Sequence, residues 1–341
     1  MEFLLKKSIF FVSKIIIIKL INLNLHFQKK QTLTIFNSIN EFFSTSQTVV
    51  TLGTFDGVHR GHQKIIERLI AESKKMNCQS LLLTFLQHPR TVLHQNSDVK
   101  LLSTNSEKEA LLLNCGLDNL VVHPFSEAFA SLSAEDFVSE ILVKKFNIAK
   151  IIIGHDHRFG NNRSADINDL IDFGQKYGFE VAQISAQEIA AVSVSSTKIR
   201  NALQEGNILM ANEFLGYDYA FSGKVVMGKQ LGRTIGIPTA NIEVDNILKL
   251  IPKMGVYVVE SLLNKKIVFG VMNIGNRPTV YGKNQTIEVH FLDFDANLYE
   301  KTITIKVLQQ LRDEKKFDSL HDLKLQIQID KENAMLFVRS R

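Results

Sequence analysis

Cysteine is scarce in this 341-residue chain, which also lacks the repeats and biased tracts of solenoid and disordered proteins. The two cysteines, Cys78 and Cys115, have neither metal-ligand nor redox-pair spacing, and two thiols are too few for a disulfide framework. The chain has no low-complexity tract and no solenoid repeat, and 45% of its residues are apolar and 22% charged. We therefore expect a folded protein that works in the reducing cytoplasm.

An excess of charge of one sign is also missing from most of the chain. The net charge is +5, and residues 1–30 alone hold six lysines against one glutamate. The formal charges of the remaining residues therefore sum to zero. A folded part without net positive charge has no extended basic surface that would attract a polyanion. We therefore expect no nucleic-acid partner.

Residues 1–32 form an atypical lysine-rich apolar extension. Lys14 and Lys19 interrupt its apolar runs before transmembrane length, so no stable membrane insertion is expected, and no small-residue cleavage site follows cleanly. Three explanations compete: an ordered extension, a membrane-surface segment, or translation from an upstream start that the working protein does not use. We favour the last, because the patterned sequence begins near Leu33. Met76 is the next methionine, so this hypothesis requires a non-Met start codon, and a native mass beginning at Met1 would refute it.

The length of the chain exceeds what one hydrophobic core usually organises, so two domains are expected. Up to about residue 184, apolar strand-like runs alternate with amphipathic helical segments, which is typical of a Rossmann-like parallel sheet wound on both faces. The expected strands are 48–54, 80–85, 120–122, 150–154 and 180–184, and the expected helices are 61–75, 107–113, 133–146 and 167–177.

After about Leu215 the helical periodicity fades, and strand-like runs separated by Gly, Asn and Pro take over. Five or six antiparallel strands are expected, and hence a small β-barrel closed by a helix at about 319–330. The runs that suggest strands are 219–226, 256–262, 267–273, 286–292 and 302–308. We place the domain boundary near Gly216, which divides the patterned chain into 33–215 and 216–341.

A glycine-rich turn with two histidines follows the first expected strand. It reads Gly53-Thr54-Phe55-Asp56-Gly57-Val58-His59-Arg60-Gly61-His62. Phosphate binds at such strand-to-helix turns because backbone amides and the positive end of the helix dipole face it. Two imidazoles three residues apart can face the same phosphates. The turn therefore predicts a nucleoside triphosphate site.

The turn resembles the HxGH signature of the nucleotidylyltransferase superfamily, and its Gly-x-Phe-Asp-Gly part is similar to the FAD synthetase branch. Three further segments resemble elements of that branch in the same order: Thr84-Phe85 with His88-Pro89-Arg90, Gly154-His155-Asp156-His157-Arg158-Phe159-Gly160, and Val194-Ser195-Ser196-Thr197-Lys198-Ile199-Arg200. Leu86 and Gln87 depart from the family pattern, and their effect on adenylylation is left open.

The resemblance implies an enzyme that transfers an adenylyl group from ATP to FMN by positioning and charge stabilisation, with magnesium on the phosphates. His59 and His62 would act on the phosphates and the developing negative charge. The implied ATP-binding residues are Gly53, Phe55, Gly57, His59, His62, Ser196, Thr197 and Arg200, of which the last three would clamp the triphosphate. Asp156 would hydrogen-bond the flavin or the nucleotide.

The start of the expected barrel holds the longest informative stretch, from Gly223 to Asn241. Its glycines allow a loop to fold back tightly around phosphate. The side chains of Thr239 and Asn241 then offer two neutral oxygens to one cation. These residues are Gly223, Gly228, Gly232, Gly236, Thr239 and Asn241. The stretch resembles the Gly-rich loop and Pro-Thr-Ala-Asn signature of bacterial riboflavin kinases. Residues 255–257 and 273–279 match further elements, although Val280 stands where an aromatic residue is common.

The kinase resemblance implies roles for four residues. Thr239 and Asn241 would bind the magnesium of ATP. Glu288 would be the base that accepts the proton of the substrate hydroxyl, since strand alternation places Glu288 and His290 on the face opposite the apolar residues. Arg312 would lie over the flavin ring or its phosphate, with the closing helix as a gate.

Both signatures in one chain imply a bifunctional riboflavin kinase/FAD synthetase of the bacterial type, which uses riboflavin, FMN and ATP and has no obligate protein partner. Two alternatives stay open at this point: a nucleotidylyltransferase for another phosphorylated vitamin, or a flavin- or nucleotide-binding protein in which one module has decayed.

Overall fold

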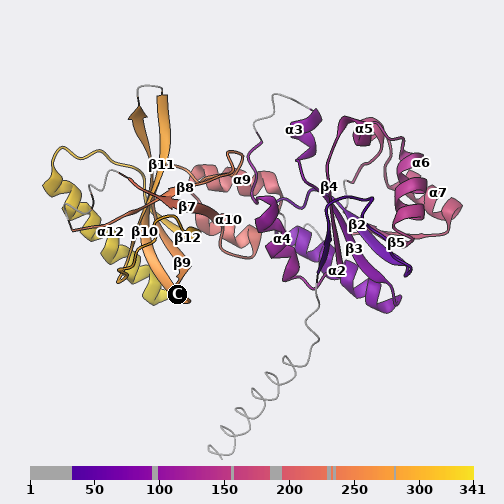
Figure 1. The fold of residues 1–341 in the computed structure, drawn as a ribbon, viewed down its shortest axis with the longest axis horizontal. Coiled ribbons are helices and arrows are strands. Elements are labelled where there is room, and N and C mark those ends of the chain that lie inside the picture. The colour runs from indigo at the N-terminus through magenta and orange to yellow at the C-terminus, as the bar shows by residue number, and fades with distance from the viewer. Residues whose placement is uncertain are drawn as a thin grey trace, which may run out of the picture.

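The computed structural model describes residues 33–93, 99–154, 157–184, 194–228, 232, 236–279 and 282–341. They form a parallel-sheet half and a barrel half, with two helices, α9 and α10, between them (Figure 1). The expectations for residues 1–32 and for Asp156 fall outside the described residues.

Six parallel strands form the first sheet, in the order β1-β4-β3-β2-β5-β6. They are β1 (Thr34–Phe36), β2 (Thr48–Leu52), β3 (Gln79–Phe85), β4 (Asn119–His123), β5 (Ile148–Ile153) and β6 (Glu180–Gln183). The chain runs outward from β2 through β3 to β4, and then crosses to β5 on the other side of β2. The order reverses between β2 and β5, and ligands bind at the carboxyl ends of strands at such a switch point.

Helices cover both faces of this sheet because successive strand residues point to opposite sides. Val49 packs with Ile66 and Leu69 of α2 (Arg60–Lys75), and α4 (Asn105–Leu113) lies on the same face. Val50 lies in the core on the other face, below α6 (Ala134–Asp136), the π-helical segment Phe137–Lys145 and α7 (Ile167–Tyr177). The predicted doubly wound sheet is confirmed.

The second half is a closed antiparallel barrel with the strand order β10-β11-β8-β7-β12-β9. The strands are β7 (Ala220–Val226), β8 (Ala240–Glu243), β9 (Gly255–Leu263), β10 (Lys266–Thr279), β11 (Gly282–Phe291) and β12 (Thr302–Arg312), and α12 (Leu320–Ser340) follows them. The predicted alternation in β11 is confirmed, since Ile287, Val289 and Phe291 are buried while Glu288 and His290 are partly exposed. The predicted barrel with its closing helix is also confirmed.

Two helices join the halves: α9 (Ser196–Glu205) and α10 (Ile208–Leu215). Ile199 and Leu203 of α9 lie in the same hydrophobic cluster as Tyr219 and Phe221 of the barrel. The helix that carries the expected triphosphate residues therefore packs its apolar face on the barrel core. Three short helical segments, α3 (Pro89–Leu93), α5 (Glu127–Ala130) and the 3-10 turn Asn161–Arg163, lie in loops of the first half.

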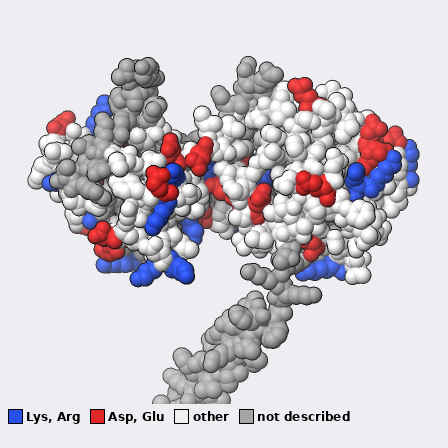
Figure 2. Space-filling model, in the orientation of Figure 1, with Lys and Arg blue, Asp and Glu red and all other residues white. Residues whose placement is uncertain are grey.

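Basic and acidic side chains are interspersed over both halves on the face that Figure 2 draws. This mixture agrees with the zero net charge of the chain beyond its first 30 residues. In the described ranges, no helix has the length and apolar character needed to cross a membrane.

Candidate active sites

The histidine turn lies at the carboxyl end of β2, at the switch point of the parallel sheet. His59 is the N-cap of α2, and its Nδ1 accepts a hydrogen bond from the backbone N–H of His62, at 3.3 Å. The two imidazole rings stack with centroids 3.6 Å apart. Gly61 permits this arrangement, since a Cβ there would lie 3.2 Å from the His59 ring. Because Nδ1 is an acceptor, neutral His59 carries its proton on Nε2, where it can donate to a ligand.

The backbone before His59 follows an unusual path. Phe55 and Val58 are buried, yet both have positive φ angles, 47° and 36°. Such backbone is costly for a side chain with a Cβ, and it persists where surrounding packing fixes it, often at functional sites. The strained turn fixes the direction in which the histidine pair leaves the sheet.

Burial keeps the histidines of this region neutral. Desolvation lowers the pKa of His59 to about 4, although Asp56 acts in the opposite direction, and desolvation lowers the pKa of His62 well below its usual range. His62 Nδ1 is buried without a hydrogen-bond partner, as is Nε2 of His157, in the loop after β5. In the part of the chain that the structure describes, these are the two buried side-chain polar atoms in this condition. Buried polar atoms normally have partners, so both fit contacts with a ligand.

The depressed pKa of His59 predicts a stability loss in acid. An unfolded histidine titrates near 6.5, so the contribution of His59 is complete above that pH and decreases as the pH falls toward about 4. Between pH 7 and pH 5 the wild type should lose about 2 kcal/mol more unfolding free energy than His59→Asn, which keeps an N-cap acceptor. Urea unfolding at the two pH values measures this difference, and equal losses in both proteins would contradict it.

The predicted clamp residues lie beside the same turn. Ser196 Oγ donates to the carbonyl oxygen of Asp56 at 3.2 Å, and Thr197 is exposed in the first turn of α9. Arg200 forms a largely buried ion pair with the Asp56 carboxylate at 2.5 Å, and its Nε donates to the carbonyl of Lys100 at 2.7 Å. The structure thus brings the predicted residues of the histidine turn, 53–62, next to those of α9. The Asp56 carboxylate fixes the position of the Arg200 side chain.

Two further charged residues of this region, Asp56 and Lys108, have no role that the sequence motifs predict. Lys108, on α4, is buried, and its Nζ donates to Thr84 Oγ1 and to the carbonyl oxygen of Phe85, both at 3.1 Å. Burial lowers its pKa to about 8, against the opposite effect of Asp56. One sequence signal was present: Lys108 stands four residues before buried Leu112 on the inner face of an amphipathic helix.

The two residues that depart from the family pattern lie just after β3. Leu86 is exposed, and Gln87 accepts a hydrogen bond from the backbone N–H of Phe125 at 3.1 Å. Gln87 therefore links the loops that follow β3 and β4.

The second candidate site lies on the barrel, where β8 meets β11. Glu288 is opposite Asn241 in the antiparallel register, and Thr239 Oγ1 donates to Glu288 Oε2 at 3.4 Å. Gly228 lies directly against the Asn241 amide, so a Cβ at this position would overlap that side chain. The Thr239–Asn241 pair and the sequence-distant Glu288 thus converge beside the glycine-rich loop.

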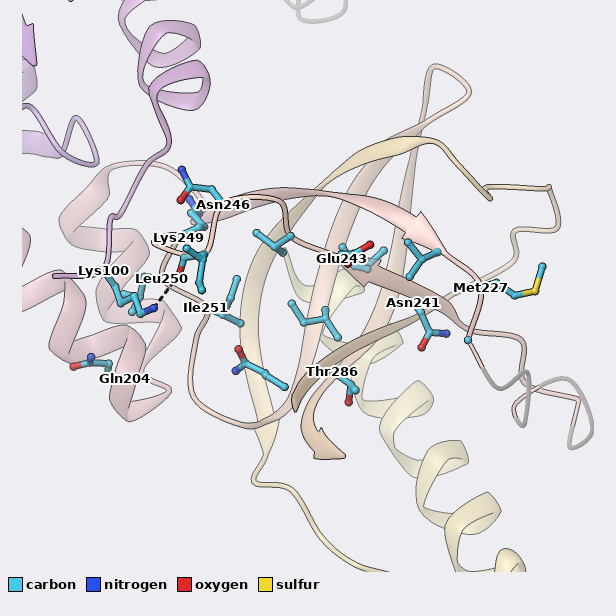
Figure 3. Close-up of a pocket in the computed structure, with 17 residues that line it drawn as sticks. Lys100, Gln204, Met227, Asn241, Glu243, Asn246, Lys249, Leu250, Ile251 and Thr286 are labelled. Atoms are coloured by element: carbon cyan, nitrogen blue, oxygen red, sulfur yellow. Dashed lines mark hydrogen bonds between the residues drawn. The ribbon is translucent and has the colours of Figure 1, made fainter. Parts of the chain in front are cut away.

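Two cavities adjoin this second site, and Gly228 and Asn241 line both. The smaller, of about 300 Å³, is also lined by Thr239 and by the loop from Phe294 to Tyr299. The larger, of about 690 Å³, runs from Asn241 and Thr286 to the junction with the first half at Lys100 and Gln204 (Figure 3).

The remaining predicted barrel residues lie in strands β7 and β12 and in the segment before Thr239. Gly223 is in β7, and Gly232 and Gly236 belong to the segment that leads to Thr239. Arg312 is held against α12 by Asp330, with NH2 2.8 Å from Oδ2, and its guanidinium carbon is 5.8 Å from the centre of the Phe317 ring. The Arg312 guanidinium therefore joins the last strand to the closing helix.

The donors at the barrel site suit a hard cation that is mainly bound by phosphates. Thr239 and Asn241 offer neutral oxygens, and no cluster of three or more His, Cys, Asp or Glu that could hold a metal occurs within the described ranges. Magnesium is often held by few protein oxygens together with substrate phosphates. The residues present fit that mode of binding.

Comparison with known proteins gives the family. A family model described as FAD synthetase matches residues 43–198, and one described as riboflavin kinase matches residues 215–338. The bifunctional riboflavin kinase/FMN adenylyltransferase of Escherichia coli (strain K12) is 39% identical over 290 residues, which cover 85% of this chain and 92% of that protein. The protein of the same name from Haemophilus influenzae is 35% identical over 293 residues, covering 85% and 94%.

A solved structure shares the whole two-part fold. It is titled a macrolide-efflux protein from Streptococcus pneumoniae, is 29% identical, and superimposes with a TM-score of 0.80 over 89% of this chain and 98% of that one. The sequence relatives and the two matched family models agree along most of the chain. The chain belongs to the bifunctional riboflavin kinase/FMN adenylyltransferase family.

Proposed function

We propose that this chain phosphorylates riboflavin to FMN in its barrel half and transfers an adenylyl group to FMN, giving FAD, in its parallel-sheet half. We assign residues 216–341 to the kinase and residues 33–215 to the adenylyltransferase. The observation that carries the proposal is the presence of two separate constellations, the stacked His59 and His62 at the sheet switch point and the convergence of Thr239, Asn241 and Glu288 on the barrel.

In the kinase step, the ribityl hydroxyl of riboflavin attacks the γ-phosphorus of ATP, and ADP leaves. Glu288 accepts the hydroxyl proton as the new P–O bond forms. We place the triphosphate in the smaller cavity, which Gly228 and Thr239 line, because a glycine-rich backbone suits phosphate. Arg312, which Asp330 holds against the closing helix, keeps its proposed place over the flavin ring or its phosphate.

In the adenylyl transfer step, a phosphate oxygen of FMN attacks the α-phosphorus of ATP, and pyrophosphate leaves. Neutral His59 donates from Nε2, and His62 Nδ1 gains the polar contact that it lacks in the free protein. The N-terminus of α9 presents Ser196 and Thr197 to the triphosphate, and Arg200 supplies positive charge while Asp56 fixes its direction. Asp156 keeps its proposed role as a hydrogen-bonding residue for flavin or nucleotide.

Magnesium is the proposed metal for both steps, with Thr239 and Asn241 as its protein ligands in the kinase. When bound there, it would neutralise phosphate charge. Thr239→Val should raise the magnesium concentration needed for half-maximal FMN formation by about tenfold, because it removes one oxygen ligand without changing side-chain size. Magnesium titrations of both activities measure this, with Thr304→Val, on an exposed part of β12, as the control. An unchanged titration would remove Thr239 from the metal site.

The proposed function is tested by incubating purified protein with riboflavin, ATP and magnesium, and separately with FMN, ATP and magnesium. The first mixture should yield FMN and then FAD, and the second should yield FAD directly. Release of neither product would reject the proposed function. We place the reactions in the cytoplasm, a compartment that suits the free thiols of Cys78 and Cys115.

A further inference from the structure

One segment of the parallel-sheet half is paired with the barrel half. This segment, residues 99–103, is called the strap here. The backbone N–H of Leu101 donates to the carbonyl of Leu248 at 2.7 Å, and the N–H of Leu250 donates to the carbonyl of Leu101 at 2.8 Å. These bonds make a short parallel bridge between the strap and the loop that precedes β9. Figure 3 shows Lys100 and Lys249 together at this end of the larger cavity.

Lys249 is the charged residue at the centre of this junction. Its side chain is 1% exposed, and its Nζ lies 2.7 Å from the strap carbonyl of Leu102 and 2.7 Å from Glu107 Oε2 on α4. Nζ also lies 4.6 Å from the centre of the Tyr219 ring. A buried ammonium group needs such partners. Removing it takes the donor from the Leu102 carbonyl and the counter-charge from Glu107, whose carboxylate keeps hydrogen bonds from the backbone N–H groups of Thr104 and Ser222. A lysine of the barrel half thus fixes two groups of the other half.

The opposite side of the strap faces the histidine turn. The backbone N–H groups of Leu102 and Ser103 both donate to the Asp56 carboxylate at 3.0 Å. Asp56 in turn pairs with Arg200, whose Nε donates to the strap carbonyl of Lys100. The Leu102 carbonyl that contacts Lys249 and the Ser103 N–H that donates to Asp56 therefore belong to the same peptide group.

We propose that Lys249, a residue of the kinase half, is a positioning residue for adenylyl transfer: by fixing the strap it sets the place of Asp56, and through Asp56 the direction of Arg200. This inference rests on the proposed function, because it assigns Arg200 to the ATP phosphates. On this proposal, one activity depends on the other half of the chain and the reverse does not hold. The adenylyltransferase depends on a side chain of its neighbour, because both hydrogen bonds of Lys249 Nζ go to the strap and to α4.

The test compares Lys249→Met with Lys306→Met. The control removes a lysine whose Nζ pairs with Glu260 at 2.7 Å between two barrel strands and does not touch the strap. For each protein, kcat and KM are measured for FMN formation and for FAD formation from supplied FMN. In Lys249→Met we expect kcat for FAD formation to fall by about tenfold or more, since a displacement near 1 Å of a group that orients the reacting phosphates can cost about 100-fold. FMN formation should stay within about twofold, and Lys249→Arg should recover part of the loss.

FMN formation by the same polypeptide reports whether the protein is folded. Glu107→Gln supplies a second variant, because it keeps side-chain size and an acceptor for the Thr104 N–H while removing the charge partner of Lys249. A selective fall in FAD formation in this variant supports the inference even if Lys249→Met does not fold. Unchanged FAD formation in either folded variant, or an equal fall of both activities in Glu107→Gln, would overturn it. Failure of wild-type protein to make FAD would instead reject the proposed function itself.

Discussion

Glu288→Gln should slow FMN formation from riboflavin by about 100- to 10,000-fold, the range that general bases usually contribute. The amide cannot accept the hydroxyl proton, although its size and its hydrogen bond with Thr239 Oγ1 can be kept. FAD formation from supplied FMN should be unchanged, because we assign it to the other half. Separating FMN and FAD by chromatography after single-substrate incubations measures both steps.

Glu300→Gln is the matched control for this variant. Glu300 also belongs to the barrel, but its carboxylate pairs with Lys224 at the surface. It should leave both steps unchanged, which separates loss of a base from loss of one negative charge. Normal FMN formation by Glu288→Gln would remove Glu288 from the reaction.

His62→Ala should produce the opposite pattern, with FAD formation reduced by about 100- to 1,000-fold and FMN formation retained. The change removes the ring that stacks on His59 and the Nδ1 atom that has no protein partner, whereas the backbone N–H that binds His59 remains. Steady-state rates for the two reactions, measured on one preparation, test this directly.

The control for His62→Ala is His321→Ala, an exposed imidazole on α12. It should change neither rate. If His62→Ala abolished FMN formation as well, the assignment of the two steps to separate halves would be wrong.

The sequence predicted those parts of the fold in which local periodicity and burial agree. The helical periodicity predicts a helix at 167–177, and α7 occupies Ile167–Tyr177, because Asp166 caps its start and Gly178, in the αL conformation, ends it. β8 was not among the expected strand runs, since four residues are too few to show an alternation. The closing helix runs ten residues beyond the expected end at 330. The polar residues near Asp330 suggest that the helix ends there. The helix continues because Arg312 pairs with Asp330 and Ala334 packs in the core.

The residues of the candidate sites also fall into those that local motifs predict and those that depend on tertiary contacts. His59, His62, Thr239 and Asn241 stand in compact motifs, which a single stretch of sequence can show. Lys249 and Glu107 could not be predicted, because their pairing joins residues 142 positions apart and depends on how the two halves meet. The packing of α9 on the barrel core was missed for the same reason.

The two proposed reactions attack ATP at different atoms, one at the γ-phosphorus and one at the α-phosphorus. Supplying riboflavin with ATP that carries radioactive phosphorus at only one of these positions, and then isolating FMN and FAD, distinguishes them. We expect γ-labelled ATP to label FMN, and FAD to acquire one phosphorus from each kind of label. FMN labelled from the α-position, or FAD that carries no α-label, would contradict the proposed pair of reactions.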